Sequence, residues 1–268
     1  MAKLRLDLLL VQRGLCETRA KAQARILAGE VLVADCPVTK AGTAVDEAAS
    51  IRLRGEAPPF VSRGGLKLVG ALDLWGIDPA GLTCFDAGSS TGGFTDCLLQ
   101  RGAAKVYAVD VGTNQLHWQL RSDPRVVSME QVNLRTWDPT SIPERCTLLV
   151  ADLSFISLRL AIPPVLPSLL PGAEAVLLVK PQFEAGRKDL VGTGGIVRNP
   201  AVHRRVLAET WAFFAETALH PQALALSPIK GGEGNIEFLM RLALGKEPGS
   251  LEAALAGLIQ PWGTVPPP

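Results

Sequence analysis

The stretch that decides the fold runs from Asp86 to Thr95 and reads DAGSSTGGFT. It follows an apolar segment at 83–85 and precedes an expected helix at about 93–101, so it is a strand-to-helix turn. Its glycines let the backbone approach a ligand closely, and the helix start offers free N–H groups. No Lys-Ser/Thr follows the glycines and the spacing is not GxGxxG, which argues against both common nucleotide motifs. When this motif is considered alone, it is also consistent with a tight strand-to-helix turn that binds no ligand.

Outward from this turn, apolar strands alternate with helical segments. We expect the strands at 105–110, 126–129, 147–151 and 173–179, the last of them preceded by a helix. This rhythm predicts a parallel, doubly wound sheet covered by helices. Two later strands, 223–226 and 238–244, are joined by a loop too short for a helix, so we expect an antiparallel edge.

Charged residues stand where several of these strands end. Asp110 closes the second strand, where a carboxylate can accept hydrogen bonds from ribose hydroxyls, although a simple capping role is equally common. Asp152, in VADLSF, and Lys180, in LLVKPQFE, close two further strands. A lysine at the end of an apolar strand is unusual, because a buried ammonium group needs partners. The alternative is that the aliphatic part of the side chain lies along the surface and the amine reaches water. With the glycine turn, Asp110 predicts an adenosine-type ligand.

Two more charged residues are candidates only if they converge on this edge. Lys67 precedes the sheet in SRGGLKL, on a helix with Leu66, Leu68, Val69 and Leu72. Glu237 begins the last strand, after a glycine-rich loop. Each alone is more often a solvated charge, so their interest depends on meeting Asp152 and Lys180.

The first 55 residues read as a separate small unit of two helices on a β-hairpin. Leu6, Leu9 and Leu10 have helical spacing, and Thr18 is a plausible N-cap for a second helix. Strands are expected at 31–33 and 51–53, with a turn at 35–37. The residues 55–59, GEAPP, look like a stiff linker, and the segment 247–268 like a poorly ordered tail.

Charge and composition limit the possible functions. The whole chain carries a net charge of +1, so contact with nucleic acid must come from local clusters such as Arg5, Arg19, Lys21 and Arg25. A solvated helix face explains that cluster equally well. Five scattered cysteines and three distant histidines form no metal or redox pattern, so we expect no metal. Without a signal sequence or a membrane span, we expect a soluble, cytoplasmic protein.

Two family resemblances cover the chain up to about residue 244. The stretch RLDLLLVQRGLCETRAKAQARILAGEVLVADCPV resembles the S4 RNA-binding domain. The remainder resembles FtsJ-like ribose 2′-O-methyltransferases, whose Lys-Asp-Lys-Glu tetrad matches Lys67, Asp152, Lys180 and Glu237. The S4-plus-FtsJ order, with SRGGLKL, DAGSSTGGFTD, ADLSFISL, KPQFEAGR and GGIVRNP, is similar to the TlyA (hemolysin A) rRNA methyltransferase family.

The resemblance implies an α/β fold: a Rossmann-like class I methyltransferase with a mostly parallel seven-stranded sheet and an antiparallel edge, preceded by a small α+β S4 domain. The expected boundaries are 1–55 for the S4 domain, 56–61 for the linker, 62–246 for the methyltransferase domain and 247–268 for the tail. The Pro58-Pro59 pair is stiffer than a switching tether should be.

The implied activity is S-adenosylmethionine-dependent 2′-O-methylation of cytidine in 16S and/or 23S rRNA, on ribosomal RNA or subunits, with no obligate protein partner. The implied RNA contacts are Arg5, Arg19, Lys21 and Lys40. The expected cofactor contacts are Gly88, Ser89, Ser90, Thr91, Gly92, Asp110, Val111, Asn133 and Asp152.

In the implied reaction, Lys180 could act as a neutral general base, or Lys67 and Lys180 could orient the hydroxyl and stabilise its developing charge. Three other functions compete. An S4-fronted pseudouridine synthase would need no nucleotide turn, and a pore-forming hemolysin would need a span or a long cationic amphipathic helix. A non-catalytic RNA-binding scaffold would not need the tetrad.

Overall fold

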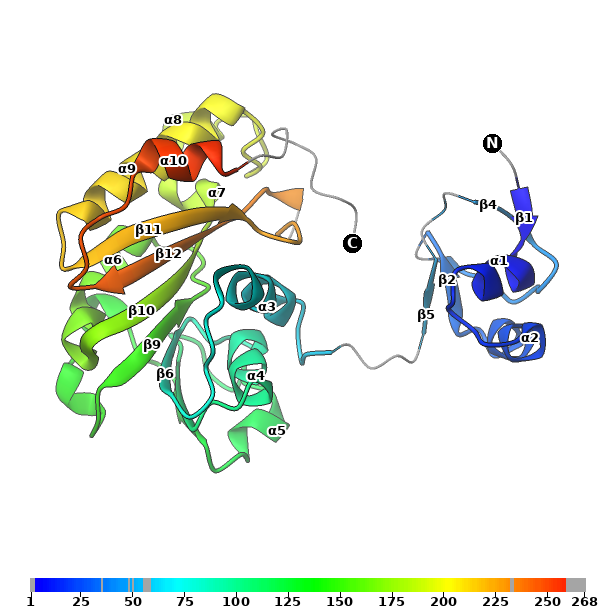
Figure 1. Cartoon of the computed structure of the whole chain (residues 1–268), viewed down its shortest axis with the longest axis horizontal. Coiled ribbons are helices and arrows are strands. Elements are labelled where there is room, and N and C mark those ends of the chain that lie inside the picture. Colours follow the sequence, from blue (N-terminus) through cyan, green and yellow to red (C-terminus); the bar gives the residue numbers. More distant parts are fainter. Residues whose placement is uncertain are drawn as a thin grey trace. The chain divides into compact units, whose positions relative to one another are not determined.

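The structure, a computed structural model, describes residues 3–34, 36–47, 49, 51–54, 59–231 and 234–258. The chain divides into two compact units, Met1–Pro58 and Pro59–Pro268 (Figure 1). Residues 55–58 lie outside the described residues, so the first half of the linker expected at 56–61 is not described. Its second half belongs to the second unit, because Phe60 packs in that unit's core and Val61 donates its N–H to Asp96 at 2.7 Å.

The N-terminal unit contains the two expected helices on small sheets. Its elements are β1 (Lys3–Arg5), α1 (Leu6–Gln12), α2 (Arg19–Leu27), β2 (Val31–Val33), β3 (Cys36–Pro37), β4 (Ala44–Asp46) and β5 (Ile51–Leu53). Leu6, Leu10, Ile26 and Val31 form the centre of its core. Thr18 caps α2 as predicted, because its side chain accepts a hydrogen bond from the backbone N–H of Lys21 at 3.2 Å.

The predicted turn at 35–37 is wrong for two of its residues. Cys36 and Pro37 form β3, which pairs antiparallel with β2 in the order β3-β2-β5. The chain reverses earlier, near Ala34, which has a φ of 48°. Proline fits here because β3 is an edge strand and its missing N–H breaks no internal ladder.

The second unit is built on one mixed sheet. Its strands are β6 (Thr83–Ala87), β7 (Lys105–Val109), β8 (Val126–Met129), β9 (Cys146–Ala151), β10 (Leu169–Val179), β11 (Leu219–Leu226) and β12 (Phe238–Leu244). Their order is β11-β12-β10-β9-β6-β7-β8. Every pair from β10 to β8 is parallel, whereas β12 runs antiparallel to both its neighbours. The predicted mostly parallel sheet with an antiparallel edge is confirmed.

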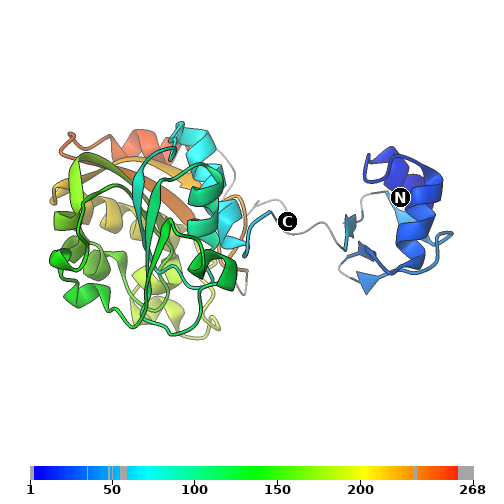
Figure 2. The same cartoon turned by 90° about the horizontal axis from the view of Figure 1, so that it is seen from below.

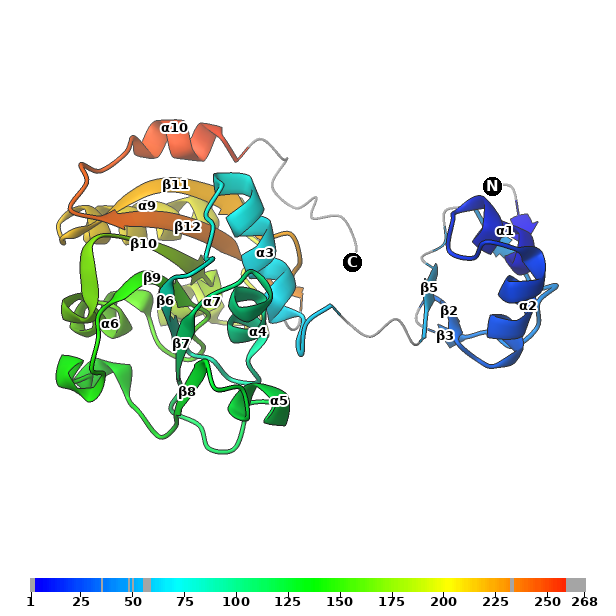
Figure 3. The ribbon, with the colours of Figure 1, turned by 60° about the horizontal axis from the view of Figure 1, so that its bottom comes forward.

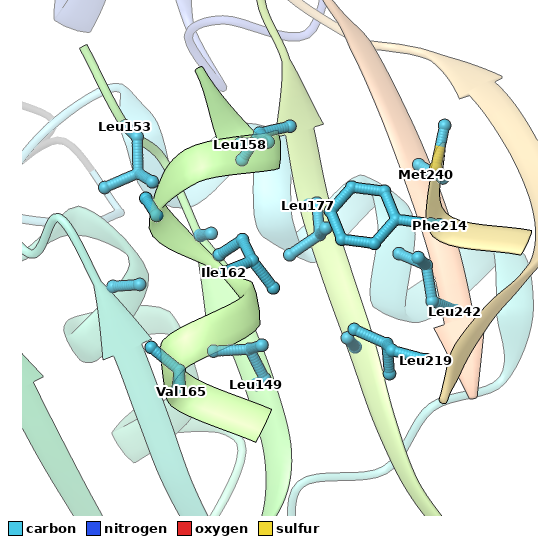
Figure 4. Close-up of a cluster of buried hydrophobic side chains, with 14 of the residues drawn as sticks. Leu149, Leu153, Leu158, Ile162, Val165, Leu177, Phe214, Leu219, Met240 and Leu242 are labelled. Carbon is cyan, nitrogen blue, oxygen red and sulfur yellow. The ribbon is translucent and has the colours of Figure 1, made fainter. Parts of the chain in front are cut away.

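Helices cover both faces of this sheet (Figures 2 and 3). One face packs against α3 (Gly64–Trp75), α4 (Gly93–Gln100) and α5 (Trp118–Arg121). The other packs against α6 (Leu158–Ala161), the 3-10 turns around it and α9 (Pro200–Ala215). In Figure 4, Leu177 of β10 lies beside Phe214 of α9. Because successive residues of β9 and β10 alternate between the two faces, both strands are apolar throughout their central part.

Three segments differ from the sequence-based expectation. The helix before β10 is only the single turn α6, followed by a 3-10 segment Pro163–Ser168 rich in proline. Helix α9 was not predicted. The expected disordered tail contains α10 (Leu251–Ala256), whose Leu251 and Leu255 pack against the core; residues 259–268 lie outside the described part.

The strand order reverses between β6 and β9. The chain passes from β6 to β7 and β8 on one side, then crosses back to β9 on the other. In open parallel sheets, ligands bind at the carboxyl ends of the strands beside such a reversal. The glycine-rich turn follows β6 and Asp152 follows β9, so both lie at this point, and Asp152 donates its N–H to the carbonyl of Ala87 at 3.1 Å.

Candidate active site

The glycine-rich turn has backbone geometry that only glycine adopts without strain. Gly88 and Gly92 have φ values of 83° and 99°. A Cβ on Gly88 would lie 2.8 Å from the carbonyl oxygen of Asp152, so a side chain there would force β6 and β9 apart. Helix α4 then begins at Gly93 without a side-chain cap, so the N–H groups of Gly93 and Phe94 are available to a ligand, whereas the N–H of Thr95 contacts Asp86.

Asp110 joins this turn to the turn after β7. Its Oδ2 accepts a hydrogen bond from the N–H of Ser90 at 2.8 Å, and its Oδ1 accepts one from Gly112 at 2.7 Å. Each oxygen keeps a second lone pair that a hydroxyl group could use. Val111 beside it is exposed, and Asn133 accepts a hydrogen bond from the N–H of Arg135 at 3.0 Å. The site thus offers acceptors and an apolar surface side by side.

The four charged residues singled out by sequence meet in one cluster. The Nζ of Lys180 lies 2.6 Å from Asp152 Oδ1, and the Nζ of Lys67 lies 2.7 Å from Glu237 Oε2 and 3.7 Å from Asp152 Oδ2. Asp152 therefore bridges the two lysines. Two positive and two negative groups balance, which makes their burial tolerable.

Strand register explains why residues so distant in sequence converge. Val179 of β10 pairs with Phe238 of β12, so Lys180 and Glu237, each one residue beyond this pair, leave neighbouring strands at the same edge. Asp152 follows directly after β9, the neighbour of β10. Lys67 comes from α3, which packs over the same sheet.

Sequence reasoning missed Ser154 as a member of this cluster. The Nζ of Lys180 donates a hydrogen bond to Ser154 Oγ at 2.9 Å. The next residue, Phe155, is 92% exposed with a φ of 65°, and its ring centroid lies 5.1 Å from that of Phe183. The only sequence signal was the position of a small hydroxyl residue two places after Asp152.

Asp86 is a fully buried carboxyl at the start of the turn. Thr95 donates its hydroxyl to Oδ2 at 2.6 Å, whereas Oδ1 has no hydrogen-bond partner among the described residues. Burial raises the pKa of Asp86 to about 7, and the hydrogen bond from Thr95 opposes that rise.

A cavity of about 270 Å³ connects the turn with the cluster. Its walls include Ser89 and Thr91 on one side and Lys67, Asp152 and Lys180 on another. The lining also includes two basic residues that sequence reasoning did not assign, Arg63 and Lys230. Hence a ligand held by the turn would share this space with a second molecule held by the charged cluster.

In the N-terminal unit, the expected RNA-binding arginines are anchored on a buried carboxylate. Asp7 accepts hydrogen bonds from Arg5 Nε and Nη2 at 3.1 and 3.0 Å, and from Arg19 Nε at 2.9 Å. The Arg5 guanidinium holds the pKa of Asp7 well below its usual range. Lys21 lies 2.5 Å from Glu17, and Lys40 is exposed. The arginines are half-exposed, so their orientation is fixed while part of each remains free for a ligand.

Among the described residues there is neither a candidate membrane span nor a candidate metal-binding cluster. No helix among them is long and apolar enough to cross a membrane. No group of three or more His, Cys, Asp or Glu side chains in that same part of the chain could hold a metal ion.

Comparisons with known proteins agree with this geometry. The FtsJ-like methyltransferase family model matches residues 60–244, and the S4 domain model matches residues 4–51. The 16S/23S rRNA (cytidine-2′-O)-methyltransferase TlyA of Mycobacterium tuberculosis is 44% identical over 89% of this chain and 89% of its own. The chain belongs to the TlyA family of FtsJ-like methyltransferases.

Other members of the family extend the match. YqxC of Bacillus subtilis, which bears the name of an rRNA methyltransferase, is 49% identical over 90% of this chain and 85% of its own length. A solved structure from Streptococcus thermophilus, named as a hemolysin, has a TM-score of 0.73 and 42% identity, and covers 96% of both chains. The family thus includes proteins under both kinds of name.

Proposed function

We propose that this protein transfers a methyl group from S-adenosylmethionine to the 2′-hydroxyl of a cytidine in ribosomal RNA. The observation that carries the proposal is the meeting of Lys67, Asp152, Lys180 and Glu237 beside the glycine-rich turn, in a single cavity. The name of the Mycobacterium tuberculosis relative supports the choice of a cytidine ribose in 16S and 23S rRNA.

The residues around the turn fit this cofactor. The cavity beside the uncapped start of α4 and the free lone pairs of Asp110 suit a ligand with an amino acid part and a ribose. Gly88, Ser89, Ser90, Thr91 and Gly92 would contact the methionine portion and Asp110 the ribose, with Val111, Asn133 and Asp152 as further contacts. When bound, S-adenosylmethionine supplies an electrophilic methyl group on its sulfonium.

The charged cluster would act on the ribose hydroxyl. A 2′-hydroxyl is a very weak acid and must lose its proton as its oxygen attacks the methyl group. Lys180 faces Asp152 and Ser154, which leaves one of its three donor positions for the 2′-oxygen. This arrangement favours orientation of the oxygen and stabilisation of its negative charge, with the hydroxyl proton passing to solvent; a neutral Lys180 would instead take that proton on its Nζ.

The remaining members of the cluster would support Lys180. Lys67, paired with Glu237, adds a second positive charge on the cavity wall. Asp152 contacts both lysines and would keep them at a fixed separation. Alignment of the methyl group with the oxygen would contribute much of the rate.

The N-terminal unit would hold the RNA. Arg5, Arg19, Lys21 and Lys40 are its proposed contacts, and the anchored guanidinium groups of the first two suit phosphate oxygens. An S4 domain over residues 1–55 would bind the RNA, and a catalytic domain from 59 to at least the end of α10 would transfer the methyl group, with a linker between them. Action on ribosomal RNA implies a cytoplasmic protein.

The test uses purified protein, methyl-labelled S-adenosylmethionine, and 30S or 50S subunits that lack the modification, with free 16S and 23S rRNA in parallel. We expect label on at least one of these RNAs, and the labelled species identifies the substrate. Measurable cofactor binding without label on any of the four would refute the proposed substrate. Absence of cofactor binding would refute the methyltransferase activity.

A further inference from the structure

We propose that Glu184 is a positioning residue for methyl transfer, because its buried carboxylate clamps the segment after β9 to the turn after β10. These two segments carry Asp152, Ser154 and Lys180. The inference rests on the proposed function, since it concerns the same site, but it involves a residue outside the tetrad.

Both carboxylate oxygens of Glu184 are committed to the segment after β9. Glu184 is only 5% exposed and ends the short helix α7 (Pro181–Glu184), four residues after Lys180. Its Oε2 accepts the hydroxyl of Ser157 at 2.6 Å, and its Oε1 accepts the backbone N–H of Leu158 at 2.7 Å. A buried carboxylate that accepts two such bonds is costly to remove, because its donors are left unpaired.

Arg159 completes the clamp from the same segment. Its Nε lies 3.5 Å from Glu184 Oε2, and its Nη2 donates to the backbone carbonyl of Glu184 at 3.0 Å. Burial raises the pKa of Glu184, whereas the bonds from Ser157 and Leu158 and the charge of Arg159 lower it. The carboxylate is therefore desolvated and depends on these donors.

The first residues of the segment after β9, Asp152 and Ser154, contact Lys180. The Nζ of Lys180 lies 2.9 Å from Ser154 Oγ and 2.6 Å from Asp152 Oδ1. Between these contacts and those of Glu184, the ring centroids of Phe155 and Phe183 lie 5.1 Å apart. Segment 152–159 thus contacts segment 180–184 along its whole length.

Backbone hydrogen bonds between β9 and β10 do not hold the two segments together. The parallel ladder between β9 and β10 ends at Ala151 and Leu177, before either catalytic segment begins. Side chains must hold the two segments together beyond that pair. Because Glu184 does not line the cavity, it would act through Ser154, Asp152 and Lys180 and not on the substrate.

The first measurement is hydrogen exchange, followed by mass spectrometry, on the full-length wild type, E184A and E184Q. The N–H of Leu158 loses its acceptor in E184A, so the peptide covering 153–159 should exchange about 10-fold faster or more. E184Q retains one acceptor oxygen, so the exchange rate of this peptide in E184Q should lie between those of the wild type and E184A. Val106→Ala, a cavity-forming change in β7 on the opposite face of the sheet, is the matched control and should leave this peptide unchanged.

The second measurement separates catalysis from binding. We expect kcat for methyl transfer to fall about 10- to 100-fold in E184A, with partial rescue in E184Q, while the Kd for S-adenosylmethionine changes less than about 3-fold. In a K180A background, E184A should cause a clearly smaller further loss of kcat, because much of its effect passes through Lys180. V106A should keep a wild-type kcat below its own Tm.

Unchanged exchange over 153–159 in E184A would overturn the clamp. Faster exchange with an unchanged kcat, or an equal loss in the K180A background, would overturn its positioning role. A wild-type protein that methylates no RNA would instead remove the proposed function, and with it the catalytic part of this inference. The exchange result would still show whether Glu184 holds the segment.

Discussion

Three carboxylates in the described part of the chain lie against charged or hydrogen-bonding partners. Asp152 contacts two lysines, Asp7 contacts two arginines, and Glu184 contacts a hydroxyl, a backbone N–H and an arginine. Such groups cannot be removed singly without leaving a partner uncompensated. Substitutions at these positions should therefore be compared with neutral variants of similar size.

Lys180→Ala should lower kcat about 10²- to 10⁴-fold, the usual contribution of a group that handles a proton or its charge. Cofactor affinity should change little, because the turn after β6 is untouched. Methyl transfer to subunits under single-turnover conditions measures this loss. Lys246→Ala is the control, since this exposed lysine follows the opposite end of β12; equal rates for K180A and wild type would refute the role of Lys180.

Asp86→Asn should change how stability depends on pH. Because burial raises the pKa of Asp86 from 3.8 to about 7, the folded protein keeps a proton that the unfolded chain releases. The stabilising contribution of this proton is complete below the lower pKa and is lost as the pH rises to the higher one.

The Tm of D86N minus that of the wild type should therefore be more positive at about pH 8 than at about pH 5. Thermal denaturation at both pH values measures the difference. Asp73→Asn, on the exposed side of α3, is the control and should show no such trend. A pH-independent difference for D86N would mean that Asp86 is ionised in the folded protein throughout this range.

At the residue level, the sequence indicated the tetrad only through strand ends and family resemblance. Lys180 stood out because lysine rarely ends an apolar strand, but Lys67 and Glu237 had no local signal of their own. Ser154 and Glu184 were invisible because their roles come from contacts between two segments 26 or more residues apart.

At the scale of elements, the turn after β6 has little tolerance for added side-chain volume. Gly88 has a positive φ, and a Cβ added to it would lie only 2.8 Å from the carbonyl oxygen of Asp152. The turn and the end of β9 must therefore lie in direct backbone contact for the site to form.

Gly88→Ala should weaken S-adenosylmethionine binding about 10-fold or more, because it adds backbone strain and separates β6 from β9. Gly192→Ala is the matched control: its φ is 74°, but nothing lies within 4 Å of its Cβ. Both variants place an alanine at a positive φ and therefore add backbone strain. Only G88A should show a weaker affinity for S-adenosylmethionine in calorimetry. Equal affinities would show that the turn does not hold the cofactor.

Elements with strong periodicity were predicted and others were not. The central strands and α3 were recognised because their apolar runs are long. Strands β1 and β4 each carry a single large apolar residue, Leu4 and Val45, whereas the equally short β2 and β5 carry two or more and were predicted. Helix α9 did carry a signal that was overlooked, an N-capping Asn199 followed by Pro200 at its first position.

At the scale of the whole molecule, catalysis and RNA contact are assigned to different units. The tetrad and the cavity belong to the unit that begins at Pro59, and the anchored arginines belong to the unit that ends at Pro58. Their contributions should be separable by mutation. Composition alone could not predict this division, because the overall charge is close to neutral.

The double variant R5A/R19A should bind its ribosomal substrate about 10- to 100-fold more weakly, with a salt dependence reduced by up to about two charges. Its Kd for S-adenosylmethionine should stay unchanged. Binding to subunits at several salt concentrations measures both effects. Arg145→Ala, an exposed arginine of the catalytic unit, is the control; unchanged RNA affinity in R5A/R19A would assign RNA binding elsewhere.

The most direct test locates the methyl group itself. Unmodified 30S and 50S subunits are incubated with S-adenosylmethionine and either wild type or K180A, and the rRNA is digested to nucleosides for mass spectrometry. We predict 2′-O-methylcytidine with the wild type and almost none with K180A. A methyl group on a base, or no methylated nucleoside despite cofactor binding, would contradict ribose methylation by this site.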